Sequence, residues 1–228
     1  MFTDTGDYYA VAASLPSLPR FDRAKRLPIT RRQLDARLAM LSDEDRGTAD
    51  DLEHFLEWQH HPVEEDNLAI LQAYEVLLEQ TDNVALREMM IHRTNLRTIM
   101  AALRRRQGGH GPPGPGEIWG AGRWVRHVET NWSDPHLGLS AAQPWVTQAA
   151  ELLAAGESLE LERLLMGLVW DHLSRLTETR PFSLEHVLAY VFKWDILSRW
   201  LAYDVTAARD RLEELTSDAI DGHSPLFG

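Results

Sequence analysis

Residues 182–204 are apolar on nearly every side of the helix that they predict, reading FSLEHVLAYVFKWDILSRWLAYD. Pro181 breaks what precedes them, Ser183 stands where a helix N-cap is expected, and Glu185 falls in the first turn. A surface helix carries one apolar stripe, so a helix that is apolar on most sides must be covered by several neighbours. We therefore expect residues 182–204 to form the central helix of a helical bundle.

The length and composition of the sequence limit the classes of protein to which the chain can belong. The chain has 228 residues, which is enough for one large domain or two small ones. It has no cysteine, which excludes a disulfide scaffold and a thiol-ligated zinc site and fits a reducing compartment. No apolar run reaches the length of a membrane span, and the first residues lack the basic flank of a signal peptide. We expect a cytoplasmic protein.

The charge also bears on partners. The net charge of −12 argues against nucleic acid as the main partner. Basic residues gather between Arg20 and Arg37, and acidic residues gather between Asp43 and Asp66. These runs are either two solvated faces or docking surfaces for partners of opposite sign.

Apolar residues at helical spacing predict an N-terminal helical bundle within residues 1–107. The predicted helices cover about 31–42, a stretch from Leu52 that Pro62 ends, 64–80, and a long helix that Asp82 or Asn83 caps. Thr30 and Gln33 have the spacing of a capping box. We expect residues 8–18 to form a strand or an extended arm between prolines, and residues 42–48 to form a polar hinge.

Residues 108–116, GGHGPPGPG, predict a flexible or semi-extended linker. Beyond it, residues 117–145 hold four of the eight tryptophans among glycines and prolines, and we expect a short helix and irregular structure there. Helical spacing returns at 143–155, at 159–176, in the central helix and at 205–220. The predicted fold is mainly α: two linked helical bundles, the second within 117–228, with a short extended N-terminal segment.

Motifs for chemistry are weak. GHGPPG at 109–114 matches a phosphate-cradling glycine pattern, but no strand precedes it and prolines occupy two of its positions. Glu57 and His60 have the Glu-x-x-His spacing of di-iron helical bundles, but the sequence has no second copy. Metalloprotease, nucleophile-elbow and P-loop motifs are missing. We expect no cofactor, no metal and no catalytic residue.

Arginines offer a second kind of candidate site. Asn95, Arg97 and Arg104 lie on the long predicted helix, and Lys193, Asp195 and Arg199 lie inside the central helix. Asp195 and Arg199 are four residues apart, so they can form an ion pair along one helical face. These groups are either ordinary helix ends and intrahelical ion pairs, or arginines that reach across an interface to another protein.

Some of these residues resemble two related families. Asn95-Leu96, Arg104 and Gly108 are similar to the repeated unit of the V-type ATPase C/d (AC39-like) family, and so is LEHVLAY at 184–190. YYAVAASLP at 8–16, with Arg199-Trp200, resembles an uncharacterised bacterial family encoded among V/A-type ATPase subunits. Residues 117–145 match neither family. Members of the C/d family are longer, with three bundles, and this chain has room for about two.

The resemblance implies a mechanical function. A C/d-like chain is a non-catalytic central-stalk linker of a bacterial V/A-type ATPase, peripheral to the inner membrane. Its partners are the central-stalk coiled-coil subunit and the proteolipid ring. We expect Trp124 and Trp132 to line the socket for the stalk, because aromatic anchors concentrate in interfaces. The full candidate interface is Asn95, Arg97, Arg104, Trp124, Trp132, Arg199 and Trp200.

Two other functions stay open from the sequence alone. One is a stand-alone helical adaptor or regulatory protein unrelated to a rotary ATPase. The other is a helical metalloenzyme that uses Glu57 and His60.

Overall fold

The computed structural model describes residues 8–56, 67–114 and 116–221. Within these residues the chain forms nine α-helices, one short 3-10 helix and no strand, so the predicted mainly α class is confirmed. The elements in chain order are α1 (Tyr9–Ser14), η1 (Phe21–Arg23), α2 (Arg31–Leu38), α3 (Asp43–Leu56), α4 (Asn67–Gln80), α5 (Val84–Gln107), α6 (Val125–Thr130), α7 (Trp145–Ala155), α8 (Ser158–Thr177) and α9 (Leu184–Asp221).

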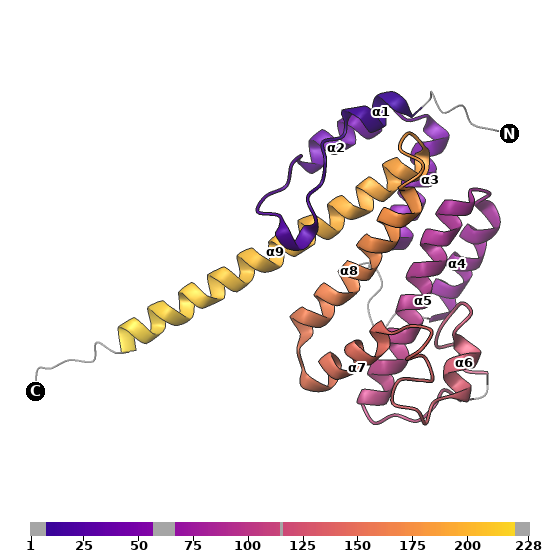
Figure 1. Cartoon of the computed structure of the whole chain (residues 1–228), viewed down its shortest axis with the longest axis vertical. Helices are drawn as coiled ribbons and strands as arrows, with labels where there is room; N and C mark the ends of the chain where they lie inside the picture. Colours follow the sequence, from indigo (N-terminus) through magenta and orange to yellow (C-terminus); the bar gives the residue numbers. More distant parts are fainter. Residues whose placement is uncertain (1–7, 57–66, 115, 222–228) are drawn as a thin grey trace, which may run out of the picture.

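Three long helices, α5, α8 and α9, form the centre of the molecule (Figure 1). Helix α8 packs against both α5 and α9. Helices α1 and α3 and the 3-10 helix η1 cover the N-terminal half of α9, where Val187, Leu188 and Leu197 are fully buried. Helix α4 lies against α5, and α6 and α7 lie at the C-terminal end of α5.

Helix α9 is longer than predicted. The sequence pattern predicts one helix at 182–204 and another at 205–220, but the structure has a single helix of 38 residues. At 1.5 Å per residue it is roughly 57 Å long. Neither glycine nor proline interrupts it, so nothing in its sequence breaks the backbone ladder. Its C-terminal part extends beyond the other helices (Figure 1).

Three predicted helix caps are confirmed. The Thr30 side chain accepts a hydrogen bond from the backbone N–H of Gln33, and the Gln33 side chain accepts one from the backbone N–H of Thr30. These two bonds make a complete capping box. Asn83 accepts from the backbone N–H groups of the first turn of α5. The Ser183 hydroxyl accepts from the backbone N–H of His186 at 3.3 Å, at the start of α9. Local hydrogen bonding therefore sets where these helices begin.

Two predictions about the N-terminal region are wrong. Residues 9–14 form helix α1 rather than a strand or extended arm, because Tyr8 and Val11 are buried against the core. Residues 42–48 are not a hinge but the beginning of α3: the Ser42 hydroxyl accepts from the backbone N–H of Asp45 at 3.1 Å. Acidic residues in this first turn suit the helix dipole.

Residues 117–145 wrap the C-terminal half of α5. Trp119, Leu137 and Leu139 are buried in one cluster with α5, α7 and α8. The Thr98 hydroxyl of α5 donates to the carbonyl of Ala121 at 2.7 Å and accepts from its N–H at 3.0 Å. Helix α5 also packs against α7 and α8, so helices on the two sides of the 108–116 linker share a core. The boundaries of the two bundles stay a prediction.

Gly138 should be intolerant of a side chain. Its φ is +68°, and a Cβ there would lie 2.8 Å from Cγ of Asn131, whose amide is held by the carbonyl of His127. We expect Gly138→Ala to lower the free energy of unfolding by about 3 kcal/mol, from backbone strain and overpacking together. Gly156 has a similar φ of +74° but open space around it, so Gly156→Ala should cost only about 1 kcal/mol. Equal losses in urea unfolding would contradict the crowding.

Candidate functional site

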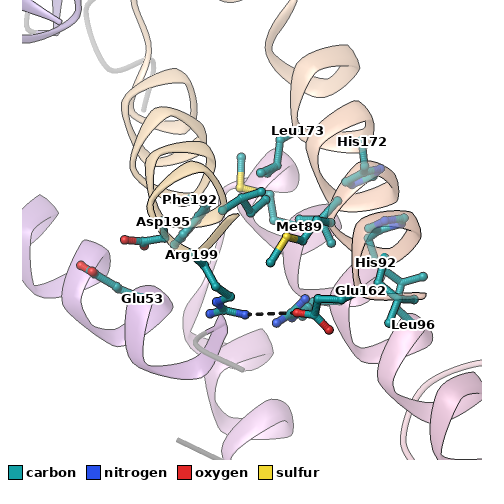
Figure 2. A pocket seen from close by; sticks show the side chains of 15 residues that line it. Glu53, Met89, His92, Leu96, Glu162, His172, Leu173, Phe192, Asp195 and Arg199 are labelled. Carbon is teal, nitrogen blue, oxygen red and sulfur yellow. Dashed lines mark ion pairs between the residues drawn. The ribbon is translucent and has the colours of Figure 1, made fainter. Parts of the chain in front are cut away.

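A cavity of about 70 Å³ lies where α5, α8 and α9 meet, with Glu53 of α3 at its edge (Figure 2). Its wall is largely apolar, because each of the three helices turns its core-facing stripe toward it. The main apolar lining residues are Met89, Leu96, Leu165, Met166, Phe192 and Ile196. Charged residues line the same space: Glu53, Arg93, Glu162, Asp195 and Arg199.

Two ionic groups lie on either side of α9. Asp195 and Arg199 are one helical turn apart, yet they face different partners (Figure 2). Arg199 Nη1 lies 3.9 Å from Glu162 Oε1 of α8. On the other side, Arg31 of α2 bonds Glu53 of α3 and lies 3.8 Å from Asp195 Oδ1. The predicted arginine and aspartate of the central helix therefore connect α9 to α8, α2 and α3.

The electrostatics around Arg199 are unfavourable to positive charge. The pKa of Arg93, on α5, is lowered to about 9, chiefly by burial and then by the charge of Arg199, while Glu162 opposes the shift. The Nε–H of Arg199 is buried and has no hydrogen-bond partner among the described residues. A buried donor left unsatisfied costs about 1–3 kcal/mol. Arg199 thus has one buried donor without a hydrogen-bond partner among the described residues.

A pair of histidines forms one side of the cavity. His92 of α5 and His172 of α8 stack with ring centroids 3.9 Å apart and an angle of 8° between the rings. The pKa of His92 is lowered to about 3, first by burial and next by the neighbouring His172. The pKa of His172 is also lowered, by burial and then by Arg175. Both rings are therefore neutral at pH 7, and within the described chain the Nε2 atom of each has no hydrogen-bond partner.

These features define what the cavity can do chemically. An imidazole whose pKa is far below 7 is a poor proton acceptor at neutral pH, since efficient acid–base groups titrate near the working pH. An apolar wall with a small number of polar groups is instead typical of a pocket that holds and orients a small molecule.

The residues predicted as an interface occupy different places. Arg104 is exposed in the last turn of α5, whereas Asn95 is buried and Arg97 is partly buried. Arg199 lines the cavity. Trp200 packs edge-on against Phe21, with ring centroids 5.4 Å apart. The contact of these residues with a partner stays a prediction.

The two tryptophans expected to line a socket are half-buried in the cluster around α5. The ring of Trp124 lies under the guanidinium of Arg123, at 4.7 Å, and edge-on to His127. The carbonyl of Trp132 accepts a hydrogen bond from Arg106. Both tryptophans thus contribute to the chain's own packing.

Sequence reasoning missed Arg93, Glu162 and the histidine pair. A signal was present: His92 follows Met89 by three residues and precedes Leu96 by four, so it stands in the apolar stripe of α5. His172 has the same relation to Val169 on α8. Glu57 and His60, the predicted metal-binding alternative, lie outside the described residues. The described residues contain no group of three histidines or carboxylates that could hold a metal ion.

Comparison with known protein families, with curated proteins and with solved structures found no match to this chain. No helix in the described part of the chain combines the length and the apolar character needed to cross a membrane. The described residues form an all-α protein, with a cavity lined by apolar and charged residues between its three central helices.

Proposed function

We propose that this chain is a non-catalytic linker in a bacterial V/A-type ATPase, similar in role to members of the C/d (AC39-like) family, that couples the central stalk to the proteolipid ring. The sequence resemblance is the basis of this proposal. One observation supports it further: the resembling segments at 8–16, 184–190 and 199–200 pack together around α9. Residues 184–190 and Arg199-Trp200 are parts of α9, and α1, which holds most of residues 8–16, packs against the same helix.

The packing around α9 suits a mechanical role. A part that transmits torque must resist bending, and three helices of 20 or more residues run through this molecule. Trp194 and Phe21 fix the N-terminal segment to α9, and Arg31 connects α2, α3 and α9. Buried aromatic contacts and ion pairs across several helices favour a body that moves as one piece.

The first test is assembly. The chain is co-expressed with the central-stalk coiled-coil subunit and the proteolipid ring from the same genome, purified through a tag on the stalk protein, and weighed by native mass spectrometry. The proposal predicts a stable complex with one copy of this chain per stalk. A folded chain that binds neither folded partner would refute the proposal, and the chain would then be better described as a stand-alone helical adaptor.

Arg104 allows a finer test, because it is the member of the predicted interface that the structure leaves clearly exposed. We expect Arg104→Glu to weaken capture by the stalk at least tenfold, since reversing a charge at a contact adds repulsion. Arg126→Glu is the matched control, because Arg126 is also exposed and lies outside the predicted interface. Equal capture of the two variants would show that Arg104 does not contact the stalk. The result of the assembly test would still stand.

A further inference from the structure

The C-terminal part of α9 carries an unbroken heptad pattern. From Leu201 onward, apolar residues recur at alternating intervals of four and three residues. They are Leu201, Val205, Ala208, Leu212, Leu215 and Ala219. Because the backbone is one continuous α-helix to Asp221, these positions form a single stripe along it. The intervals are those of the a and d positions of a coiled coil.

This stripe continues the buried face of the same helix. Leu197 is fully buried and Leu201 is partly buried, in a cluster that includes Phe21 of η1 and Trp170 of α8. Figure 1 shows that the helix then extends beyond the other helices. Residues 204–221, the terminal segment of α9, are roughly 27 Å long. A helical segment of this length with an apolar stripe gains stability when a partner covers that stripe.

The polar positions of the terminal segment argue against a lipid surface as that partner. Residues 204–221 contain six acidic residues and two arginines. Helices that lie on membranes are instead rich in lysine and arginine on their polar face, because membrane surfaces are anionic. A second helix with both signs of charge beside its own stripe is the better match.

The shape of the molecule favours an antiparallel second copy of this chain. In a parallel pair, η1 and α8 of both copies would meet between the two helices, because they cover the preceding part of the same face. In an antiparallel pair the two bodies lie at opposite ends of the coiled coil. If Leu212 lies opposite Leu215 of the second copy, residues 206–221 of both copies overlap, which is nearly the whole terminal segment.

The charges beside the stripe select the same register. Arg211 and Asp218 both fall at g positions, and g positions of the two helices face one another in an antiparallel pair. With Leu212 opposite Leu215, each Arg211 is placed beside Asp218 of the second copy, twice by symmetry. Sliding by one heptad, so that Leu212 lies opposite Ala208, would place the two Arg211 residues beside each other. Opposite charges therefore favour the register with two leucine layers at its centre.

We propose that the terminal segment of α9 forms an antiparallel two-stranded coiled coil with the same segment of a second copy of this chain. Its outer layers pair Ala208 with Ala219, so the interface is small and lies at the weak end of protein interfaces. We expect a dimer Kd on the order of 100 µM. At low micromolar concentration the chain is then mainly monomeric, which is compatible with one copy per stalk. The pairing does not depend on the ATPase proposal, because it is tested with this chain alone.

The first test is sedimentation equilibrium of the full chain over concentrations on both sides of this Kd. Leu212→Ser should weaken dimerisation at least tenfold, because it places a hydroxyl in both central layers. Asp210→Ser is the matched control, since position 210 is an f position on the opposite side of the helix. Near-UV circular dichroism checks that the body stays folded. A chain that is monomeric at every concentration, or equal dimerisation of Leu212→Ser and the wild type, would overturn the proposal.

A charge exchange tests the register. Asp218→Arg should weaken dimerisation, because Arg211 would then face a second arginine, and adding Arg211→Asp should restore it. A double variant that stays as weak as Asp218→Arg would overturn the register.

Cysteine crosslinking tests the orientation, because the chain has no cysteine of its own. With oxidised glutathione as the oxidant, a mixture of Ala208→Cys and Ala219→Cys should form the mixed disulfide in preference to either homodimer. A parallel pair would instead place each cysteine beside its own copy. Preferential crosslinking of Ala219→Cys to itself would overturn the antiparallel arrangement.

Discussion

Replacing Trp194 with alanine is expected to lower the free energy of unfolding by about 4 kcal/mol, the largest effect of any single substitution considered for this chain. Trp194 is 6% exposed and packs with Ile29, Leu34 and Tyr190, which come from the N-terminal segment and from its own helix. Its indole N–H donates to the carbonyl of Ile29 at 2.8 Å. Truncation would leave both a large void and a buried carbonyl without its donor.

Two companion variants separate these contributions. Trp194→Phe keeps an aromatic ring but loses the donor and part of the volume, so it should cost about 2 kcal/mol. Tyr203→Ala removes an aromatic residue of the same helix that is 42% exposed, and it should change stability by less than about 0.5 kcal/mol. The measurement is urea unfolding followed by circular dichroism. Similar losses for Trp194→Ala and Tyr203→Ala would contradict the role of Trp194 as the anchor of the N-terminal segment.

Local signals explain which parts of the fold could be predicted. Thr30, Asn83 and Ser183 set where helices begin, through hydrogen bonds to backbone N–H groups two or three residues away. Because the partners are so close in sequence, the residue type and its spacing predict these bonds. Helix α1 could not be predicted in this way, because it has no side-chain cap and only six residues. An isolated helix of that length is unstable, and it exists here because Val11 is buried against the core.

The cavity shows the opposite limit of sequence reasoning. Its elements are individually ordinary: an arginine in a central helix, a glutamate on α8, a histidine in the apolar stripe of α5. What makes them a site is that α5, α8 and α9 bring together residues such as His92 and Arg199, which are distant in sequence. Periodicity shows which face of a helix is buried but not which residue of another helix it meets. The sequence therefore indicates Arg199 as a candidate site residue but does not indicate its partner Glu162.

Acidification should destabilise the chain through the stacked histidines between α5 and α8. The pKa of His92 is about 3 in the folded protein and 6.5 in its ordinary state, so folding favours the neutral ring. This contribution to stability is fully present above pH 6.5 and is lost as the pH falls toward 3. At pH 4 the loss amounts to about 3 kcal/mol, from 1.36 kcal/mol per pKa unit.

The neighbours of the pair explain the direction of this shift. Protonated His92 would face His172 across a stacking distance of 3.9 Å and would also lie near the cations Arg93 and Arg175. Glu88 of α5 acts in the opposite sense on His172, where its charge raises the pKa, but burial outweighs it. Charging either ring would therefore push α5 and α8 apart at the edge of the cavity.

The expected difference is measured by urea unfolding of the wild type and of His92→Gln at pH 7 and pH 4. His92→Gln should lose about 3 kcal/mol less stability than the wild type between these two pH values, because glutamine does not titrate. Carboxylates elsewhere contribute equally to both proteins and cancel in the comparison. Met89→Leu changes the same wall without changing a titrating group, so its loss should match that of the wild type. Equal losses for the wild type and His92→Gln would show that folding does not hold this ring neutral. The α5–α8 interface would then have to derive its stability from the surrounding apolar contacts alone.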